Sequence, residues 1–264
     1  MRWEDIHIDD TKLAGHLASF CFASRDIIAR YFRSNITIEG KSDDSPVTIA
    51  DKQAEAAIRQ AIKEAYPDHN ILGEEGGGIV TNALDWVIDP IDGTRVFISG
   101  KPLFGTLIAL CHQGEAIASV IDMPVLDEMF IGIKGQKSTL NGKPIAVSGI
   151  TDLSRARIAS TAPEALDEQA LESYLSLTKR ALSSNWGGDC YNYALLAAGH
   201  TDIVIEHQLA SHDIMGLVPV IESAGGIITD WDGAPVRLGH STSVIASASP
   251  ALHQAALEAM GSAR

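Results

Sequence analysis

Two carboxylates, Asp89 and Asp92, stand three residues apart directly after a short apolar run. The run Trp86–Ile88 is typical of a buried strand. Because proline cannot donate to a sheet ladder, we expect Pro90 to end this strand and to fix a bend. The bend can aim both carboxylates at one point and leave the carbonyl of Ile91 free to join them, and Mg²⁺ requires such hard oxygen ligands. The alternative is a turn in which the two acids cap a helix.

The residues that follow, Gly93 and Thr94, offer backbone N–H groups and a hydroxyl, which can hold a phosphate or position a water. Two further acidic sites stand at predicted element ends. Glu74 and Glu75 follow a short strand and lie among glycines, which permit close backbone approach. Asp213 stands at the start of a predicted helix, where the alternative role is an N-cap. Ends of elements are where α/β folds place their sites.

The composition is that of a globular enzyme with a sizeable core: 264 residues, 45% hydrophobic and 20% charged. A net charge of −14 argues against a nucleic-acid or anionic-membrane partner, because such binding needs Lys/Arg clusters. No run approaches the roughly 18 apolar residues of a membrane span. The scattered Cys21, Cys111 and Cys190 indicate reduced thiols, and residues 1–10 lack a signal-peptide core, so we expect a cytoplasmic protein.

The chain is expected to form an α+β half over residues 1–147 and an α/β half over 148–264. The first half is predicted to hold two helices, over residues 10–33 and 48–65, with a polar mobile loop over 35–46 between them. An antiparallel meander is predicted over residues 105–133. In the second half strands alternate with helices, which is the α/β signature. The strands are expected at 157–160, 202–206, 226–229 and 243–248, and the helices at 166–178, 191–198, 213–224 and 250–260.

Four ordered segments resemble the motifs of the inositol monophosphatase family: Val47–Asp51, Gly73–Glu75, Asp89–Thr94, and Asp213 with its downstream Gly-Gly pair. Together they span roughly residues 47 to 226. The resemblance implies an α/β chain folded as the layered α/β/α/β/α sandwich of the inositol monophosphatase and fructose-1,6-bisphosphatase superfamily. It also implies a Mg²⁺-dependent, lithium-sensitive phosphomonoesterase that is usually a homodimer and acts on a small phosphorylated metabolite.

Carried onto this chain, the resemblance implies two to three metal ions in each active site. Glu74, Asp89 and the carbonyl of Ile91 would hold one ion. Asp89, Asp92 and Asp213 would hold a second, and a third, weaker ion would lie near Glu74. Two cations about 4 Å apart can share phosphate oxygens, activate a water and neutralise the leaving oxygen. Mn²⁺ is an alternative to Mg²⁺.

The catalytic residues implied in the same way are Glu74, Thr94 and Asp51. Glu74 and Thr94 would orient and deprotonate the attacking water, with Asp51 polarising Thr94. The N–H groups of Gly93 and Thr94 would bind the phosphate at the start of a short helix. Glu75 is interpreted either as an outer neighbour of the metal ligands or as a solvated acid.

Substrate choice is expected to depend on Arg95, Gly188, Asp189 and Glu206. Arg95 and the next residue replace a Thr-Asn pair of many inositol monophosphatases, and together with Gly187–Tyr191 they resemble the histidinol-phosphatase branch. The positions matching Asp189 and Glu206 line the family's substrate pocket, and two carboxylates suit the ammonium and imidazole of histidinol phosphate. Inositol offers only hydroxyls. The alternatives are a structural salt bridge for Arg95 and a helix N-cap for Asp189.

The leading hypothesis is therefore a histidinol-phosphatase of histidine biosynthesis. The alternatives are an inositol-1-monophosphatase, or a sugar-bisphosphate or 3′-nucleotide phosphatase of the same superfamily. A metal-binding regulatory protein without catalysis is a rival from another class, against which the intact metal carboxylates and Thr94 count. His212 departs from the family pattern, which more often has an aromatic residue or proline there; it is interpreted as surface or neighbouring structure, with substrate contact as the alternative.

Overall fold

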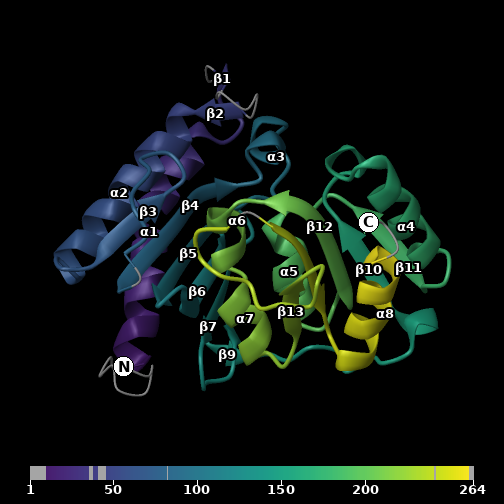
Figure 1. The fold of residues 1–264 in the computed structure, drawn as a ribbon. Coiled ribbons are helices and arrows are strands. Elements are labelled where there is room, and N and C mark those ends of the chain that lie inside the picture. Colours follow the sequence, from purple (N-terminus) through teal and green to yellow (C-terminus); the bar gives the residue numbers. More distant parts are fainter. Residues whose placement is uncertain (1–9, 36–37, 41–45, 82, 241, 262–264) are drawn as a thin grey trace.

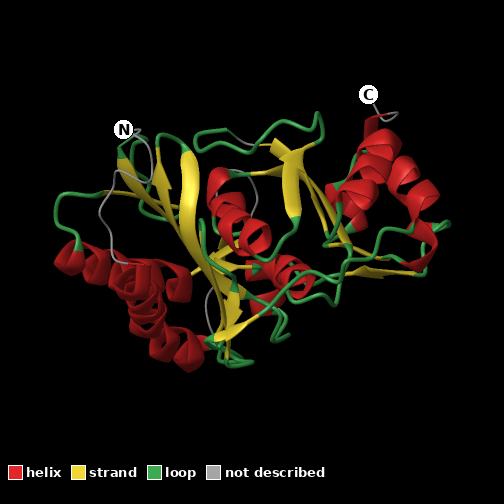
Figure 2. Cartoon of the chain, turned by 90° about the horizontal axis from the view of Figure 1, so that it is seen from below, coloured by secondary structure: helices red, strands yellow, loops and turns green. Residues whose placement is uncertain are grey.

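Two large β-sheets alternate with three layers of helices in the computed structural model, which describes residues 10–35, 38–40, 46–81, 83–240 and 242–261 (Figure 1, Figure 2). The resulting α/β/α/β/α order is the predicted one. The helices are α1 (Asp10–Tyr31), α2 (Ile49–Ala65), α3 (Thr94–Ile98), α4 (Glu168–Thr178), α5 (Cys190–Ala197), α6 (Ser211–Met215), α7 (Val218–Ser223) and α8 (Pro250–Gly261). Within the described residues, no helix is long and apolar enough to cross a membrane.

The first sheet has seven strands in the order β3-β4-β5-β6-β7-β8-β9, of which only β3 and β4 run parallel. The predicted antiparallel meander is confirmed as β5–β7. Side chains alternate across the sheet: Trp86 and Ile88 pack against α1 and α2, while Val87 faces the opposite side. The strands are β3 (Asn70–Gly73), β4 (Leu84–Asp92), β5 (Gly105–His112), β6 (Glu115–Met123), β7 (Glu128–Ile133), β8 (Thr139–Leu140) and β9 (Lys143–Pro144).

The second sheet has five strands in the order β11-β10-β12-β14-β13. Its parallel strands β10, β11 and β12 come before the antiparallel pair β13 and β14 in the chain. Helices α4 and α8 cover its outer face, where Tyr174 and Leu252 pack on Ile203 and Ile245. The strands are β10 (Arg157–Ser160), β11 (Ser183–Trp186), β12 (Ile203–Leu209), β13 (Ile227–Asp230) and β14 (Thr242–Ser247).

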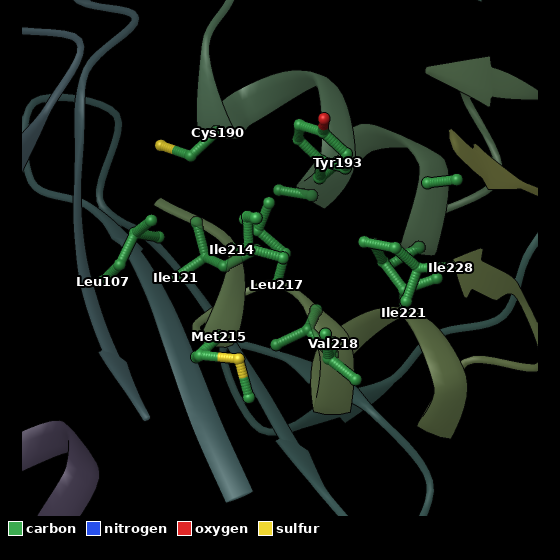
Figure 3. Packing of buried hydrophobic residues seen from close by; sticks show 14 of the residues in the cluster. Leu107, Ile121, Cys190, Tyr193, Ile214, Met215, Leu217, Val218, Ile221 and Ile228 are labelled. Atoms are coloured by element: carbon green, nitrogen blue, oxygen red, sulfur yellow. The ribbon is translucent and has the colours of Figure 1, made fainter. Parts of the chain in front are cut away.

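Helices α5, α6 and α7 fill the space between the two sheets (Figure 3). Leu107 of the first sheet, Leu217 of the helix layer and Val204 of the second sheet belong to one continuous buried cluster. The predicted boundary near residue 147 falls between the last strand of one sheet and the first of the other. Because both sheets share this core, the two halves are intimately packed.

Strand β4 does not end at Pro90, and that prediction is wrong. The ladder with β5 pairs Asp89 with Leu107, slips, and resumes with Asp92 opposite Gly105, so Pro90 lies in a β-bulge. A bulge leaves residues out of the ladder and therefore tolerates a residue without an N–H. The Pro90 carbonyl accepts a hydrogen bond of 2.8 Å from the hydroxyl of Thr106, which secures the bend.

The helix predicted over residues 213–224 is two helices, α6 and α7. Pro219 explains the break, because its ring collides with the carbonyl four residues earlier and it has no N–H to donate. Strand β11 was not predicted, since its four exposed, mostly polar residues carry no alternation. The predicted loop 35–46 contains β1 (Ile38–Gly40), which pairs with β2 (Pro46–Thr48); the rest of its centre lies outside the described residues.

Candidate active site

Three carboxylates converge at the carboxyl end of β4. The bulge turns Asp89 and Asp92 toward the same side, and α6 brings Asp213 from the other half of the chain. One carboxylate oxygen of each lies within 4.8 Å of the others. The bulge is held from within, because the N–H of Ile91 donates to Oδ1 of Asp89 at 3.0 Å. The predicted set of acids is thus brought together, although Asp213 lies inside the first turn of α6 rather than at its start.

Burial makes this cluster electrostatically costly. The pKa values of Asp89 and Asp92 are raised well above the usual range, first by desolvation and then by the neighbouring negative charges, Asp213 among them. Burial also raises the pKa of Asp213, against the opposing charge of His212. Buried carboxylates that repel one another need a cation, and all-oxygen donors favour Mg²⁺ or another hard divalent ion. The residues present therefore fit the implied metal.

Glu74 lies beside the cluster because β3 runs parallel to β4. Its N–H donates to the carbonyl of Ile88 at 3.1 Å, which extends the pairing of the two strands by one residue. His212 reaches the same place: its Nε2 lies 3.9 Å from Oε1 of Glu74 and 3.4 Å from Oδ1 of Asp213. A cavity of about 180 Å³ opens here, lined by Glu74, Asp89, Ile91, Asp92, Gly93, Thr94, Arg95, Asp189 and Asp213.

Thr94 begins α3 at the rim of this cavity, after Gly93 adopts a left-handed φ of 86° that suits glycine. The Thr94 hydroxyl lies 3.4 Å from Oδ1 of Asp51 and 3.2 Å from the carbonyl of Ile91. Asp51 is fully buried and also accepts from the N–H and hydroxyl of Thr48 at 2.8 and 2.6 Å. Burial raises the pKa of Asp51, and these hydrogen bonds oppose the rise. The predicted Asp51–Thr94 contact is present.

A second cavity of about 360 Å³ adjoins the first and shares Asp92, Arg95, Asp189 and Asp213 with it. Its remaining walls come from the second half of the chain, and they include Thr161, Tyr193, Glu206 and His207. A molecule that placed a phosphate by the metal carboxylates would therefore extend its other end toward Glu206.

Asp189 faces the point where the two cavities meet. It does not cap α5, because its backbone has a φ of 44° and a ψ of −135° and its side chain makes no cap hydrogen bond. Asp92 caps the helix instead, with its Oδ2 accepting from the N–H of Cys190 at 2.7 Å. Oδ2 of Asp189 is buried and has no hydrogen-bond partner among the described residues. Burial raises the pKa of Asp189 to about 6, although the charges of Lys101 and Arg95 oppose the rise.

Gly188 holds the turn before Asp189 and lines neither cavity. Its φ is 119°, and an added Cβ would lie 2.5 Å from Oδ1 of Asn192, so a larger residue would displace the turn. Arg95 is exposed, lines both cavities and forms no ion pair within the described part of the chain. The structural salt bridge that was the alternative for Arg95 is thus not seen among the described residues.

Glu206 projects from β12 into the larger cavity and is 8% exposed. The hydroxyl of Thr161 donates to its Oε1. Desolvation, together with the charges of Asp189 and Asp213, raises the pKa of Glu206 to about 8 despite that hydrogen bond. The hydroxyl of Tyr193, on α5 beside the central core (Figure 3), is also buried without a partner among the described residues.

Thr161 and Tyr193 line the cavity but were not predicted. Thr161 carried a usable signal, because it follows a parallel strand at its carboxyl end, where α/β folds place ligands. Tyr193 carried none, since a helical tyrosine among apolar residues is indistinguishable from core.

Comparison with known proteins identifies this arrangement. Residues 9–263 match the model of the inositol monophosphatase family. The chain belongs to that family. It is 44% identical over 248 residues to the bifunctional phosphatase IMPL2 of Arabidopsis thaliana, covering 90% of this chain and 72% of the relative. A histidinol-phosphatase of Chlorobaculum parvum is 36% identical over 207 residues, covering 77% and 80%.

An inositol monophosphatase structure from Zymomonas mobilis superimposes with a TM-score of 0.87 at 36% identity, covering 96% of this chain and all of that one. The structure of a Thermotoga maritima relative superimposes with a TM-score of 0.86 at 25% identity. The family member described here is accordingly a metal-dependent phosphomonoesterase with the inositol monophosphatase fold. Its acidic cluster of Asp89, Asp92 and Asp213 supplies the chemistry that the family's divalent metal requires.

Proposed function

We propose that this phosphatase hydrolyses L-histidinol phosphate to L-histidinol and phosphate. The observation that carries the proposal is the carboxylate of Asp189, whose Oδ2 is buried without a partner among the described residues, between the metal acids and Glu206. A buried acceptor left unsatisfied costs about 1–3 kcal/mol, which a cationic donor on the substrate would recover. Asp189 and Glu206 together suit a substrate with an ammonium and an imidazole.

The metal ions would be held as the resemblance implies, by Glu74, Asp89, the Ile91 carbonyl, Asp92 and Asp213. When bound, they would supply charge neutralisation for the phosphate and lower the pKa of the attacking water. As the resemblance implies, Asp89 would belong to both sets of metal ligands, and its side chain does contact those of Glu74 and Asp213.

The chain's own catalytic groups would then act on the water and the phosphate. Glu74 and the Thr94 hydroxyl would orient the water, and Glu74 would take its proton. Asp51 would fix the direction of the Thr94 hydroxyl. The backbone N–H groups of Gly93 and Thr94 would hold the phosphate oxygens, and Arg95 at the rim would add positive charge. The water oxygen would bond to phosphorus as the bond between phosphorus and the ester oxygen breaks, and the leaving oxygen would take up, through solvent, the proton that Glu74 had accepted.

Inositol 1-phosphate is the rival substrate, and the 36% identity to the Zymomonas mobilis inositol monophosphatase favours it. It presents only hydroxyls to Asp189 and Glu206. Three histidinol-phosphatases, at 31–36% identity, favour histidinol phosphate. Sugar bisphosphates bring a second phosphate toward two carboxylates, which would repel it, and 3′-nucleotides bring an uncharged ribose and base in place of a cation.

The deciding experiment compares kcat/KM for histidinol phosphate and inositol 1-phosphate side by side, with Mg²⁺, with Mn²⁺ and with the metal chelated. We expect histidinol phosphate to be preferred and turnover to vanish without metal. A preference for inositol 1-phosphate would contradict the proposal. A lack of turnover on every ester would instead favour a non-catalytic, regulatory protein.

We further propose a cytoplasmic homodimer that is inhibited by lithium. The first named relative is chloroplastic, so the compartment needs its own test by fractionation or imaging. Sedimentation equilibrium of the purified chain measures the oligomeric state, and a monomer would contradict the dimer. Inhibition by Li⁺ at saturating Mg²⁺ tests the remaining expectation.

A further inference from the structure

A buried glutamate on α2, Glu55, holds the loop that carries Glu74. Its side chain is 2% exposed. Oε2 accepts from the N–H of Glu75 at 2.7 Å, and Oε1 accepts from the N–H of Gly76 at 2.8 Å and from Nε of Arg59 at 2.6 Å. The carboxylate therefore holds the two peptide N–H groups that directly follow Glu74.

Arg59 closes the same arrangement from one turn further along α2. Its Nη2 donates to the carbonyl of Gly77, which in turn accepts from the N–H of Gly73 at 3.1 Å. The loop is thus held on one side by β4, through the Glu74 N–H, and on the other by the Glu55–Arg59 pair. Glu74 lies at the point between these two attachments.

Close packing explains the glycines of this loop. An added Cβ on Gly73 would lie 2.3 Å from Oε1 of Glu55, and one on Gly76 would lie 2.7 Å from the same atom. A real Cβ atom essentially never makes a non-bonded contact this short, so the loop backbone can rest on the Glu55 carboxylate only because both residues lack a side chain. The glycines on either side of Glu74 and Glu75 are therefore needed for the close contact with Glu55, and not only for the conformation of the turn.

Glu55 also lies one helical turn after Asp51, and residues four apart lie on the same face of a helix. Asp51 contacts Thr94, while Glu55 holds the loop of Glu74. We infer that the first two turns of α2 form a platform on which Glu55 is the positioning residue for Glu74, setting its carboxylate for the metal ion and the attacking water. The inference rests on the proposed metal-dependent hydrolysis.

The test is Glu55→Gln, read by calorimetric titration of Mg²⁺ into the metal-free protein without substrate. An amide has one acceptor oxygen and would turn its NH₂ toward N–H donors, so the loop must shift. We expect Mg²⁺ affinity to fall about ten-fold or more, as is typical when an outer partner of a ligand is lost. Hydrolysis should need correspondingly more Mg²⁺ for half-maximal rate and recover at high Mg²⁺.

Glu64→Gln on the same helix is the matched control, because Glu64 is exposed and bonds only to Gln60 in the contacts described here. Its Mg²⁺ affinity should equal that of the wild type. Arg59→Lys keeps the charge but loses the fork between Glu55 and Gly77, so it should weaken Mg²⁺ binding in the same direction. This variant decides the matter if Glu55→Gln does not fold.

Wild-type Mg²⁺ affinity in Glu55→Gln and Arg59→Lys would overturn the inference, and so would a lower melting temperature with unchanged affinity, which is the mark of a purely structural role. A wild-type protein that binds no Mg²⁺ and hydrolyses no ester would overturn the proposed function itself. The wild-type titration therefore separates the two failures.

Discussion

The cavity of the metal carboxylates and the cavity of Glu206 differ in how the chain builds them. The first comes mainly from two adjacent parallel strands, β3 and β4, whose ends are fixed by backbone hydrogen bonds and by a bulge. The second gathers Thr161, Asp189 and Glu206 from three separate elements of the other half. The first cavity, built from neighbouring residues, suits the chemistry common to all phosphate esters. The second, built from residues far apart in the sequence, suits recognition of the alcohol part of the substrate.

The two cavities also differ in what would neutralise them. At the metal end, the repulsion among Asp89, Asp92 and Asp213 would be relieved by cations whatever the substrate. At the other end, Asp189 and Glu206 would be relieved only by a substrate that brings its own positive charge. Substitutions at the two ends should therefore give distinguishable kinetics.

The largest effect is expected for Asp92→Asn. The variant removes one metal carboxylate, so kcat should fall by more than the 10–100-fold typical of losing an outer partner, on every ester alike. The fold should survive, because the asparagine oxygen can still accept from the N–H of Cys190. Circular dichroism checks the fold, and turnover close to that of the wild type at saturating Mg²⁺ would refute the metal assignment.

Asp189→Ala should distinguish substrate recognition from the chemistry at the metal carboxylates. Losing a buried partner for a cationic group costs about 1–3 kcal/mol, or roughly five- to 150-fold in kcat/KM for histidinol phosphate. p-Nitrophenyl phosphate has no cation, so its kcat/KM should change little. The two esters are assayed on the same preparation. If both lose equally, Asp189 serves the active-site structure and not substrate choice.

A smaller effect, of several-fold, is expected in the pH dependence of KM. Glu206 has a pKa of about 8 in the empty cavity, so it becomes charged as the pH rises from about 6.5 to 8.5. The ammonium of histidinol phosphate keeps its proton over this range, so the KM for histidinol phosphate should fall relative to that for inositol 1-phosphate as Glu206 becomes able to pair with the ammonium. The ratio of the two KM values cancels the ionisation of the phosphate, and comparison with Glu206→Gln cancels that of the imidazole. Glu206→Gln should flatten the ratio; an unchanged slope would remove Glu206 from recognition.

The smallest effect concerns the stability of the metal-free protein. Unfolded carboxyl groups release their protons near pH 4, whereas burial raises the folded-state pKa values of Asp89, Asp92 and Asp213. Their contribution to stability is complete below about pH 4 and is lost as the pH rises through the raised values. Metal-free Asp92→Asn should therefore melt several degrees above the metal-free wild type at pH 8, and Mg²⁺ should reverse the order. Calorimetry of the metal-free wild type and the metal-free variant at pH 4 and at pH 8 tests this.

Sequence reasoning succeeded where the chain is local. A carboxylate pair beside a proline and a Gly-Thr step lies within one turn of chain, so its convergence could be predicted, together with the helices before it. It failed where distant packing decides the outcome. Pro90 is typical of a strand end, and only the pairing with β5 that resumes after the bulge shows that β4 continues. Strand β11 forms because it pairs with the edge of β10, which its own residues do not indicate.

Asp189 shows the same limit of sequence reasoning, because here a local pattern predicts a contact that distant packing replaces. Its place directly before α5 is typical of an N-cap, and only the three-dimensional structure shows that Asp92 already takes the N–H of Cys190. Glu55 was passed over because a glutamate in a helix is ordinarily solvated. Its burial depends on a glycine loop twenty residues further along the chain.

The hydrogen bond from the Cys190 N–H to Asp92 joins the strand that carries metal ligands to the helix that carries Asp189. The contact uses a main-chain donor, which every amino acid except proline supplies. Protein engineers can therefore exchange the side chains around Asp189 to retune substrate choice while the joint to the metal end stays intact. Proline at position 190 is the one replacement that this joint forbids.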